Sequence, residues 1–374
     1  MDKKSSAPVD APYLQYGGQA VIEGVMMRSP RYFAVACRTP DGGIVSRMEE
    51  VDKSIVGKLK WLNKPFLRGT LALIDAMALG MRALAFASNV QMEAALTAEE
   101  EKRAPTPMEE AASASVASLV NGPPVIVSTG EVKSGRINDI AIGGTIVLSL
   151  LFGVALFVAL PTLLTDLIAK MAGWNPHAAN SMTGHQAQVK NLVDGVIKMV
   201  IFFAYIAGIS LMPQIRAVFE YHGAEHKAIN TLEAGKPLNF ENALASSRIH
   251  PRCGTSFIFI VLVINLLVFA FLPRPPVLLR IPLHLAVVPI VAGIGYEIIK
   301  FAGRFRSNGL VTTLLAPGMW SQYLTTREPR PDQVEIALTA LKAVLEAEGH
   351  RVEPDGRIPS ITEPNPLEPA AVTA

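Results

Sequence analysis

Long apolar stretches in the second half of the chain dominate its pattern of hydrophobic and polar positions. About 20 residues of helix cross a bilayer, and core helices of soluble proteins rarely reach this length with so few charges. The pattern therefore predicts a mainly α, polytopic membrane protein, with about four transmembrane helices in a domain spanning residues 137–306. The four stretches run from Ile140 to Ile168, from Leu192 to Met212, from Ser256 to Leu272 and from Ile281 to Phe301.

A further apolar segment, from Pro65 to Gln91, also has a helical pattern but carries Arg68, Asp75 and Arg82. Each charge costs about 2.5–3.5 kcal/mol at the centre of a bilayer. We therefore expect residues 61–96 to form an amphipathic helix that lies at the membrane surface or packs on the bundle. A fifth crossing is the alternative.

The remaining segments are predicted to lie outside the membrane. Residues 13–60 are expected to form a small cytoplasmic β unit, with strands near 20–27, 32–39 and 43–51 and a turn at Pro40-Asp41-Gly42-Gly43. Residues 97–136 have the composition of a flexible linker. Residues 307–349 are predicted to be a cytoplasmic helical region, with one helix between Asp332 and Glu348. Residues 1–12 and 350–374 are expected to be disordered.

Composition and charge agree with a membrane protein. The chain has 374 residues, of which 50% are hydrophobic and 18% charged, against about 25% charged in soluble domains. The net charge of +2 gives no reason to expect a nucleic-acid partner. Two cysteines, Cys37 and Cys253, exclude a disulfide framework. The first twenty residues contain no continuous apolar run, so we expect no cleavable signal peptide. The excess of Lys and Arg on one side predicts that both termini are cytoplasmic.

The segment 213–255, a predicted cytoplasmic loop, carries the most informative motif. His222, Glu225 and His226 form H-x-x-E-H, the pattern of inverted zincins, on a predicted helix that ends near Gly235. Residues four apart share one helix face, so both imidazoles can bind one metal ion. Glu225 could act as general base toward a metal-activated water. The alternative is a polar helix whose side chains are solvated or paired.

A zinc site needs at least a third protein ligand. His250 and Cys253 lie just before the third membrane segment, in a stretch that Pro251 and Gly254 favour as a turn. Either side chain could complete the site, and membrane helices could bring the two ends of the loop together. Cys253 could instead be a small buried residue at a helix end.

Four motifs together resemble the YqhQ-like family, which comprises bacterial and some plastid polytopic membrane proteins of unknown function. The motifs are residues 18–28 (GQAVIEGVMMR), 221–227 (YHGAEHK), 250–257 (HPRCGTSF) and 324–329 (LTTREP). Members are often described as predicted metal-dependent enzymes, so the resemblance implies a metal site and a location in the bacterial cytoplasmic membrane. It also draws attention to Glu23, which could be a carboxylate ligand or a partner of a ligating histidine. The alternative is an outward-facing strand residue.

These observations favour a metal-dependent hydrolase at the cytoplasmic membrane face, with zinc as the preferred divalent metal and membrane lipids as its surroundings. His222 and His226 would bind the ion, His250, Cys253 or Glu23 would complete the site, and the substrate would be a peptide or a lipid-linked compound. One alternative is a non-enzymatic scaffold or assembly factor whose metal is structural. Another is a transporter, with a path lined by Asp194, Lys198, His284 and Glu297.

Overall fold

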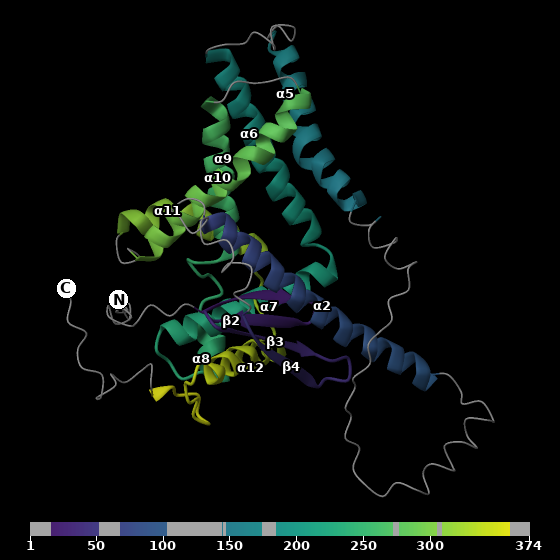
Figure 1. The fold of residues 1–374 in the computed structure, drawn as a ribbon, viewed down its shortest axis with the longest axis vertical. Coiled ribbons are helices and arrows are strands. Elements are labelled where there is room, and N and C mark those ends of the chain that lie inside the picture. The colour runs from purple at the N-terminus through teal and green to yellow at the C-terminus, as the bar shows by residue number, and fades with distance from the viewer. Residues whose placement is uncertain are drawn as a thin grey trace, which may run out of the picture.

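The computed structural model describes residues 16–51, 68–102, 144, 147–173, 185–271, 277–304 and 309–359. Long helices form a bundle at one end of the molecule, and a β-sheet flanked by helices lies at the other (Figure 1). The mainly α architecture with a small N-terminal β unit is therefore confirmed.

The bundle contains α5 (Leu160–Met171), α6 (His185–Ile209), α9 (Gly254–Phe271) and α10 (Val277–Arg304). A π-helical turn (Ala155–Ala159) precedes α5 within one continuous helical stretch. α6 packs between α5 and α9, and α10 packs on the other side of α9. These helices expose mostly apolar side chains, as helices surrounded by lipid must.

Four helices among the described residues are long and apolar enough to cross a membrane: Gly69–Leu96, Val147–Met171, Gln188–Ile209 and Gly254–Phe271. Three of them coincide with predicted crossings. The predicted crossing from Ile281 to Phe301 lies within α10. The remaining candidate, Gly69–Leu96, is the segment interpreted from sequence as a surface helix.

Charged residues inside the bundle pair with one another. Lys198 Nζ lies 2.7 Å from Asp194 on the next helical turn, as their spacing predicts, and Thr165 Oγ1 donates a 3.3 Å hydrogen bond to the same carboxylate. Lys190 Nζ lies 2.7 Å from Asp166 across the α5–α6 contact. Opposite charges that neutralise one another in this way join two helices at low cost in lipid.

The β unit is an antiparallel sheet of four strands in sequence order: β1 (Gly17–Val21), β2 (Gly24–Arg28), β3 (Tyr32–Arg38) and β4 (Ile44–Glu50). The stretch 20–27, predicted as a single strand, is instead a tight hairpin in which Val21 pairs with Gly24. Its turn includes Glu23, which has φ of +48°, an uncommon value for a residue other than glycine. Apolar residues on both sides of the turn hid the hairpin from the sequence pattern.

Helices cover both faces of the sheet. On one face, α7 (Pro213–Glu233) and α12 (Pro331–Ala347) bury the side chains of Val25 and Met27 against Tyr221, Leu341 and Leu345. Burial of this apolar surface is the main source of stability for the sheet-containing part of the fold.

The opposite face of the sheet carries α2 (Arg68–Lys102), whose Leu79 packs against Met26 and Phe33. Two of the three charges that argued against a crossing form ion pairs with the sheet, Asp75 with Arg28 and Arg82 with Glu49.

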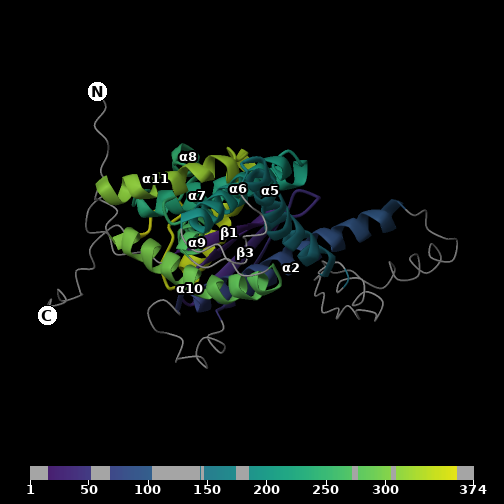
Figure 2. The ribbon, with the colours of Figure 1, turned by 90° about the horizontal axis from the view of Figure 1, so that it is seen from above.

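The N-terminal end of α2 packs on α10 instead, where Thr70 Oγ1 donates a 3.0 Å hydrogen bond to the carbonyl of Pro289. Figures 1 and 2 show α2 running obliquely between bundle and sheet and projecting to one side. The first turn of the helix thus contacts the bundle, and the part from Asp75 to Gln91 contacts the sheet.

Two predicted segment boundaries change, and one predicted region divides into two helices. Residues 97–102, assigned from composition to the linker, continue α2, and the rest of that linker lies outside the described residues. Residues 350–359, assigned to a disordered tail, are ordered because Ile358 is buried in the core and Gly356 accepts a 2.7 Å hydrogen bond from the backbone of Leu238. The region 307–349 contains two helices, α11 (Gly309–Thr325) and α12. The other segments predicted to be disordered lie outside the described residues.

Leu345 anchors α12 in the core, and its truncation tests the packing described above. Leu345 is fully buried, so Leu345→Ala should destabilise the protein by about 2–5 kcal/mol. Leu244, on the short helix α8 (Phe240–Ala245), is 38% exposed, so Leu244→Ala is the matched control. Thermal unfolding of the detergent-solubilised protein measures both. Equal midpoints for the two variants would contradict the proposed core.

Candidate metal centre

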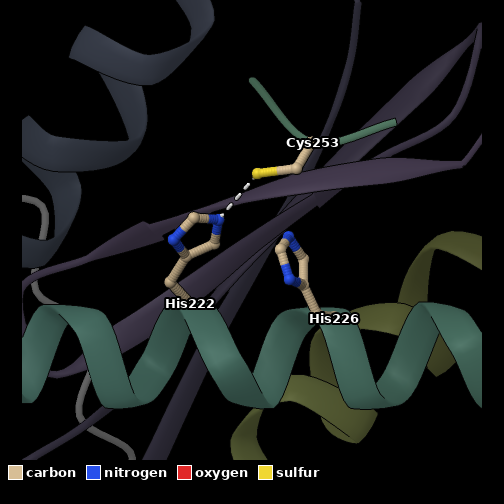
Figure 3. Close-up of side chains that lie close together, drawn as sticks. All are labelled: His222, His226 and Cys253. Atoms are coloured by element: carbon tan, nitrogen blue, oxygen red, sulfur yellow. Dashed lines mark hydrogen bonds between the residues drawn. The ribbon is translucent and has the colours of Figure 1, made fainter. Parts of the chain in front are cut away.

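The centre is built on α7. The helix starts at Pro213, which suits the first turn because it needs no backbone donor there, and it ends at Glu233. Gly235 follows with φ of +64°, the left-handed conformation of a helix C-cap predicted from the sequence. His222 and His226 project from the same face, with ring centroids 4.4 Å apart (Figure 3).

Backbone carbonyls fix the orientation of both rings. His222 Nδ1 lies 2.9 Å from the carbonyl oxygen of Thr325, and His226 Nδ1 lies 2.6 Å from that of Arg248. Because a carbonyl oxygen only accepts hydrogen bonds, each Nδ1 carries a proton in these contacts. Each Nε2 of the neutral rings is then left with a lone pair, the arrangement found in metal-ligating histidines.

Cys253 faces these nitrogens from the start of α9. Its Sγ lies 3.1 Å from His222 Nε2 (Figure 3), and ligand atoms of His222, His226 and Cys253 all lie within 4.8 Å of one another. Thr255 contributes a backbone N–H 3.4 Å from the sulfur and a hydroxyl 3.2 Å away. Two imidazoles and one thiolate are a donor set that suits zinc, and three protein ligands leave one position of a tetrahedral ion open.

His250 lies next to the converging donors, outside the group of three. Its Nε2 lies 3.4 Å from Glu233, which also pairs with Arg252, and its ring centroid is 5.7 Å from that of His226. Its backbone N–H donates a 2.9 Å hydrogen bond to Gln322. His250 therefore borders the centre without joining the three donors that come together there.

Glu225, the predicted base, is buried beside β1. Burial raises the pKa of its carboxyl group, while the charges of His222 and His250 and a backbone hydrogen bond from Gly18 act in the opposite direction. A Cβ at Gly18 would lie 2.8 Å from Glu225 Cγ, so only glycine lets the carboxylate approach the strand. A raised pKa suits a group that exchanges protons near neutral pH.

Glu23 contacts the face of α7 that packs on the sheet. Its Oε2 accepts a 3.2 Å hydrogen bond from the hydroxyl of Tyr221, whose pKa is raised by burial and then by the charge of Glu23. The three donors that converge in the described structure do not include Glu23. The residue supports α7 through Tyr221 and does not enter the donor set.

Several residues around the centre were missed by reasoning from sequence. Gln322 is fully buried and its amide donates to the carbonyl of His250 and to the hydroxyl of Ser256, each at 2.7 Å. Lys227 donates 2.7 Å and 2.8 Å hydrogen bonds to the carbonyls of Leu244 and Ser246. Thr325 lies in the LTTREP motif, so the motif did point to this segment. The motif did not show that the backbone carbonyl of Thr325, and not a side chain, contacts His222.

Comparison with known proteins gives a family without an assigned activity. Residues 64–347 match the family described as a protein of unknown function (DUF1385). The chain is 32% identical over 340 residues to the uncharacterized protein YqhQ of Bacillus subtilis (strain 168), covering 89% of this chain and 93% of that protein. No solved structure matches the chain significantly.

Metal content tests the donor set directly. We expect purified protein to bind one divalent ion and His222→Ala or His226→Ala to lose it, because two remaining donors bind such an ion weakly. His250→Gln is the control and should keep the ion. Elemental analysis of the three variants after equal exposure to zinc measures the difference. Equal content in wild type, His222→Ala and His226→Ala would exclude this centre.

Gly223 tests the support behind His222. A Cβ there would overlap the carbonyl oxygen of Arg327, two residues beyond Thr325, so Gly223→Ala should cost about 1–3 kcal/mol of stability. It should also weaken metal binding about tenfold, the size of effect known for disturbed partners of metal ligands. Gly208→Ala, in α6, meets no atom within 4 Å and should change neither quantity. Thermal unfolding and zinc titration measure both, and equal behaviour of the two variants would contradict the close contact.

Proposed function

The chain belongs to the DUF1385 family of proteins of unknown function, and we propose that it is a zinc-dependent hydrolase that works at the cytoplasmic face of a bacterial membrane. The observation that supports this most directly is the convergence of His222, His226 and Cys253 within 4.8 Å. Metal-ligating histidines almost always donate their other ring N–H to a carboxylate, a backbone carbonyl or water, and both imidazoles have such a contact here through Nδ1.

In the proposed reaction, some residues would bind the metal ion and another would transfer protons. His222, His226 and Cys253 would hold the ion, which, when bound with an open position, lowers the pKa of water to about 7 and polarises a carbonyl or phosphoryl group. Glu225 would accept a proton from water at its buried carboxylate and return it to the leaving group. Burial raises the pKa of this carboxyl group, which favours both steps near neutral pH.

The membrane setting rests on the apolar helices. The four candidate spans are compatible with a multi-pass membrane protein. Arg216, Arg248 and Arg252 lie in the segment that connects α6 to α9 and carries the centre. Since loops rich in Lys and Arg stay on the cytoplasmic side, we place this segment and both termini in the cytoplasm.

A scaffold with a structural metal is the main alternative, and the number of ligands separates it from a hydrolase. A structural zinc site has four protein ligands and no open position. The described residues bring three donors together. X-ray absorption of the zinc-loaded protein should therefore show two nitrogens, one sulfur and one light atom from solvent. A second sulfur or a third imidazole would favour the scaffold.

Glu225→Gln tests the catalytic proposal. The amide keeps the size of the side chain but cannot take up a proton, so the variant should keep its zinc and lose hydrolysis at least 100-fold. Labelled casein and a fluorescent phospholipid serve as probes for the two substrate classes, with zinc-loaded wild type as reference. Equal turnover by wild type and variant at equal zinc content, or turnover of neither probe by wild type, would defeat the hydrolase assignment.

A further inference from the structure

α11 is an uncharged helix that leaves large apolar side chains uncovered. None of its 17 residues is charged. Leu310 and Leu314 are 69% and 72% exposed, and Trp320 and Tyr323 are 64% and 58% exposed. Figures 1 and 2 show the helix projecting sideways from the base of the bundle. Exposed apolar surface of this extent marks a contact with lipid or with another protein.

The distribution of these side chains favours lipid. At 3.6 residues per turn, Leu310 and Leu314 lie close together around the axis, whereas Trp320 and Tyr323 project from other sides of the helix. A single partner surface would cover one side, but a bilayer surrounds a projecting helix. Trp and Tyr are also the residues enriched where a membrane meets water, and Arg248 lies over the ring of Tyr323 at 5.4 Å, as a cation at that boundary can.

Hydrogen bonds to α9 fix the depth of α11. Ser256 donates a 3.1 Å hydrogen bond to the carbonyl of Gly318, and Gln322 donates one of 2.7 Å to Ser256. Ser256 lies in the first turn of α9, whose span begins at Gly254. The C-terminal half of α11 therefore lies at the level where the chain enters the membrane.

The same end of α11 forms part of the metal centre. Its last residue, Thr325, supplies the carbonyl that holds His222 Nδ1, and Cys253 directly precedes the first residue of α9. The three donors thus lie close to the level at which α9 enters the membrane, beside a helix whose side facing away from α9 is apolar and exposed.

We propose that α11 lies in the cytoplasmic leaflet and that the substrate is membrane-borne, an amphiphile whose polar headgroup reaches His222, His226 and Cys253 from the bilayer. This inference rests on the proposed function and chooses between its two substrate classes. The alternative, which this inference rejects, is a peptide substrate that reaches the centre from water. The lipid chains of the substrate stay beside α11, and only the headgroup leaves the leaflet.

The position of Trp320 provides the first test. Full-length protein is reconstituted in vesicles whose phosphatidylcholine carries bromine near the headgroup, and emission of wild type is compared with that of Trp320→Phe. The difference isolates Trp320 from the other two tryptophans. We expect brominated lipid to quench the Trp320 emission, obtained as this difference, at least twofold more than aqueous iodide does. Stronger quenching by iodide would overturn the placement of α11.

Access to Cys253 is the second test. Metal-free protein in nanodiscs is treated with a maleimide attached to a phosphatidylethanolamine headgroup, or with a soluble maleimide, and labelled peptides are counted by mass spectrometry. We expect the lipid-carried reagent to label Cys253 faster. Cys37 is the internal control, because it is fully buried and its thiol pKa is raised to about 12, first by burial and then by the charge of Glu23.

A charge placed on α11 should distinguish access to Cys253 from the lipid from access to it from water. Leu314→Glu should slow lipid-carried labelling of Cys253 about tenfold and leave soluble labelling unchanged, because a carboxylate draws the helix out of the leaflet. Leu244→Glu adds the same charge on α8, away from the bundle, and should change neither rate. Faster labelling by the soluble reagent in wild type, or equal rates for Leu314→Glu and Leu244→Glu, would overturn the inference.

Zinc distinguishes failure of this inference from failure of the proposed function. Bound zinc should protect Cys253 from both reagents. Loss of that protection, together with preferred labelling by the lipid-carried reagent, would defeat the metal centre and leave the access route intact. Protection together with preferred soluble labelling would defeat the membrane-borne substrate and leave the metal centre intact.

Discussion

The proposed metal centre depends on two hydrogen bonds from imidazole rings to backbone carbonyls. The carbonyls of Thr325 and Arg248 hold His222 and His226 by their Nδ1 atoms, so each Nε2 is directed toward Cys253. A free histidine side chain on a helix surface loses rotamer freedom when it binds a metal. Here the fold has already restricted both rings, and the donors can bind an ion without first reorganising.

Those carbonyls come from segments that the membrane helices position. Thr325 ends α11, which is bonded to α9 through Ser256, and Arg248 lies in the loop just before α9. The sheet and α12 support the opposite side of α7 through buried apolar packing. The centre therefore forms only when the bundle and the sheet-containing part are joined correctly, and an ion bound there would stabilise that junction.

The sequence predicted elements whose cause is local and missed those whose cause is tertiary. Long uncharged runs are visible in local composition, and two histidines four residues apart share a helix face by helix geometry. Three of the candidate spans and the shared face of His222 and His226 were therefore predictable. The hairpin at Glu23 was missed because its turn residues, Ile22 and Glu23, are apolar or acidic. Glu23 takes the left-handed conformation in a turn that the paired strands on both sides hold together. The order of residues 350–359 depends on Leu238, more than 100 residues earlier in the chain, and no local pattern encodes that contact.

The choice among candidate ligands shows the same limit. From the sequence alone, His250 and Cys253 were equally good candidates for the third ligand, because they lie three residues apart before the same helix. The structure separates them because Glu233, about two helical turns beyond His226 on α7, engages His250, while Cys253, directly before α9, lies 3.1 Å from His222. The proposed donor set therefore takes Cys253, since a carboxylate already engages the histidine that could have joined it. Glu233 also pairs with Arg252, and Gln322 hydrogen-bonds the backbone of His250, so two side chains hold the turn that presents the thiol.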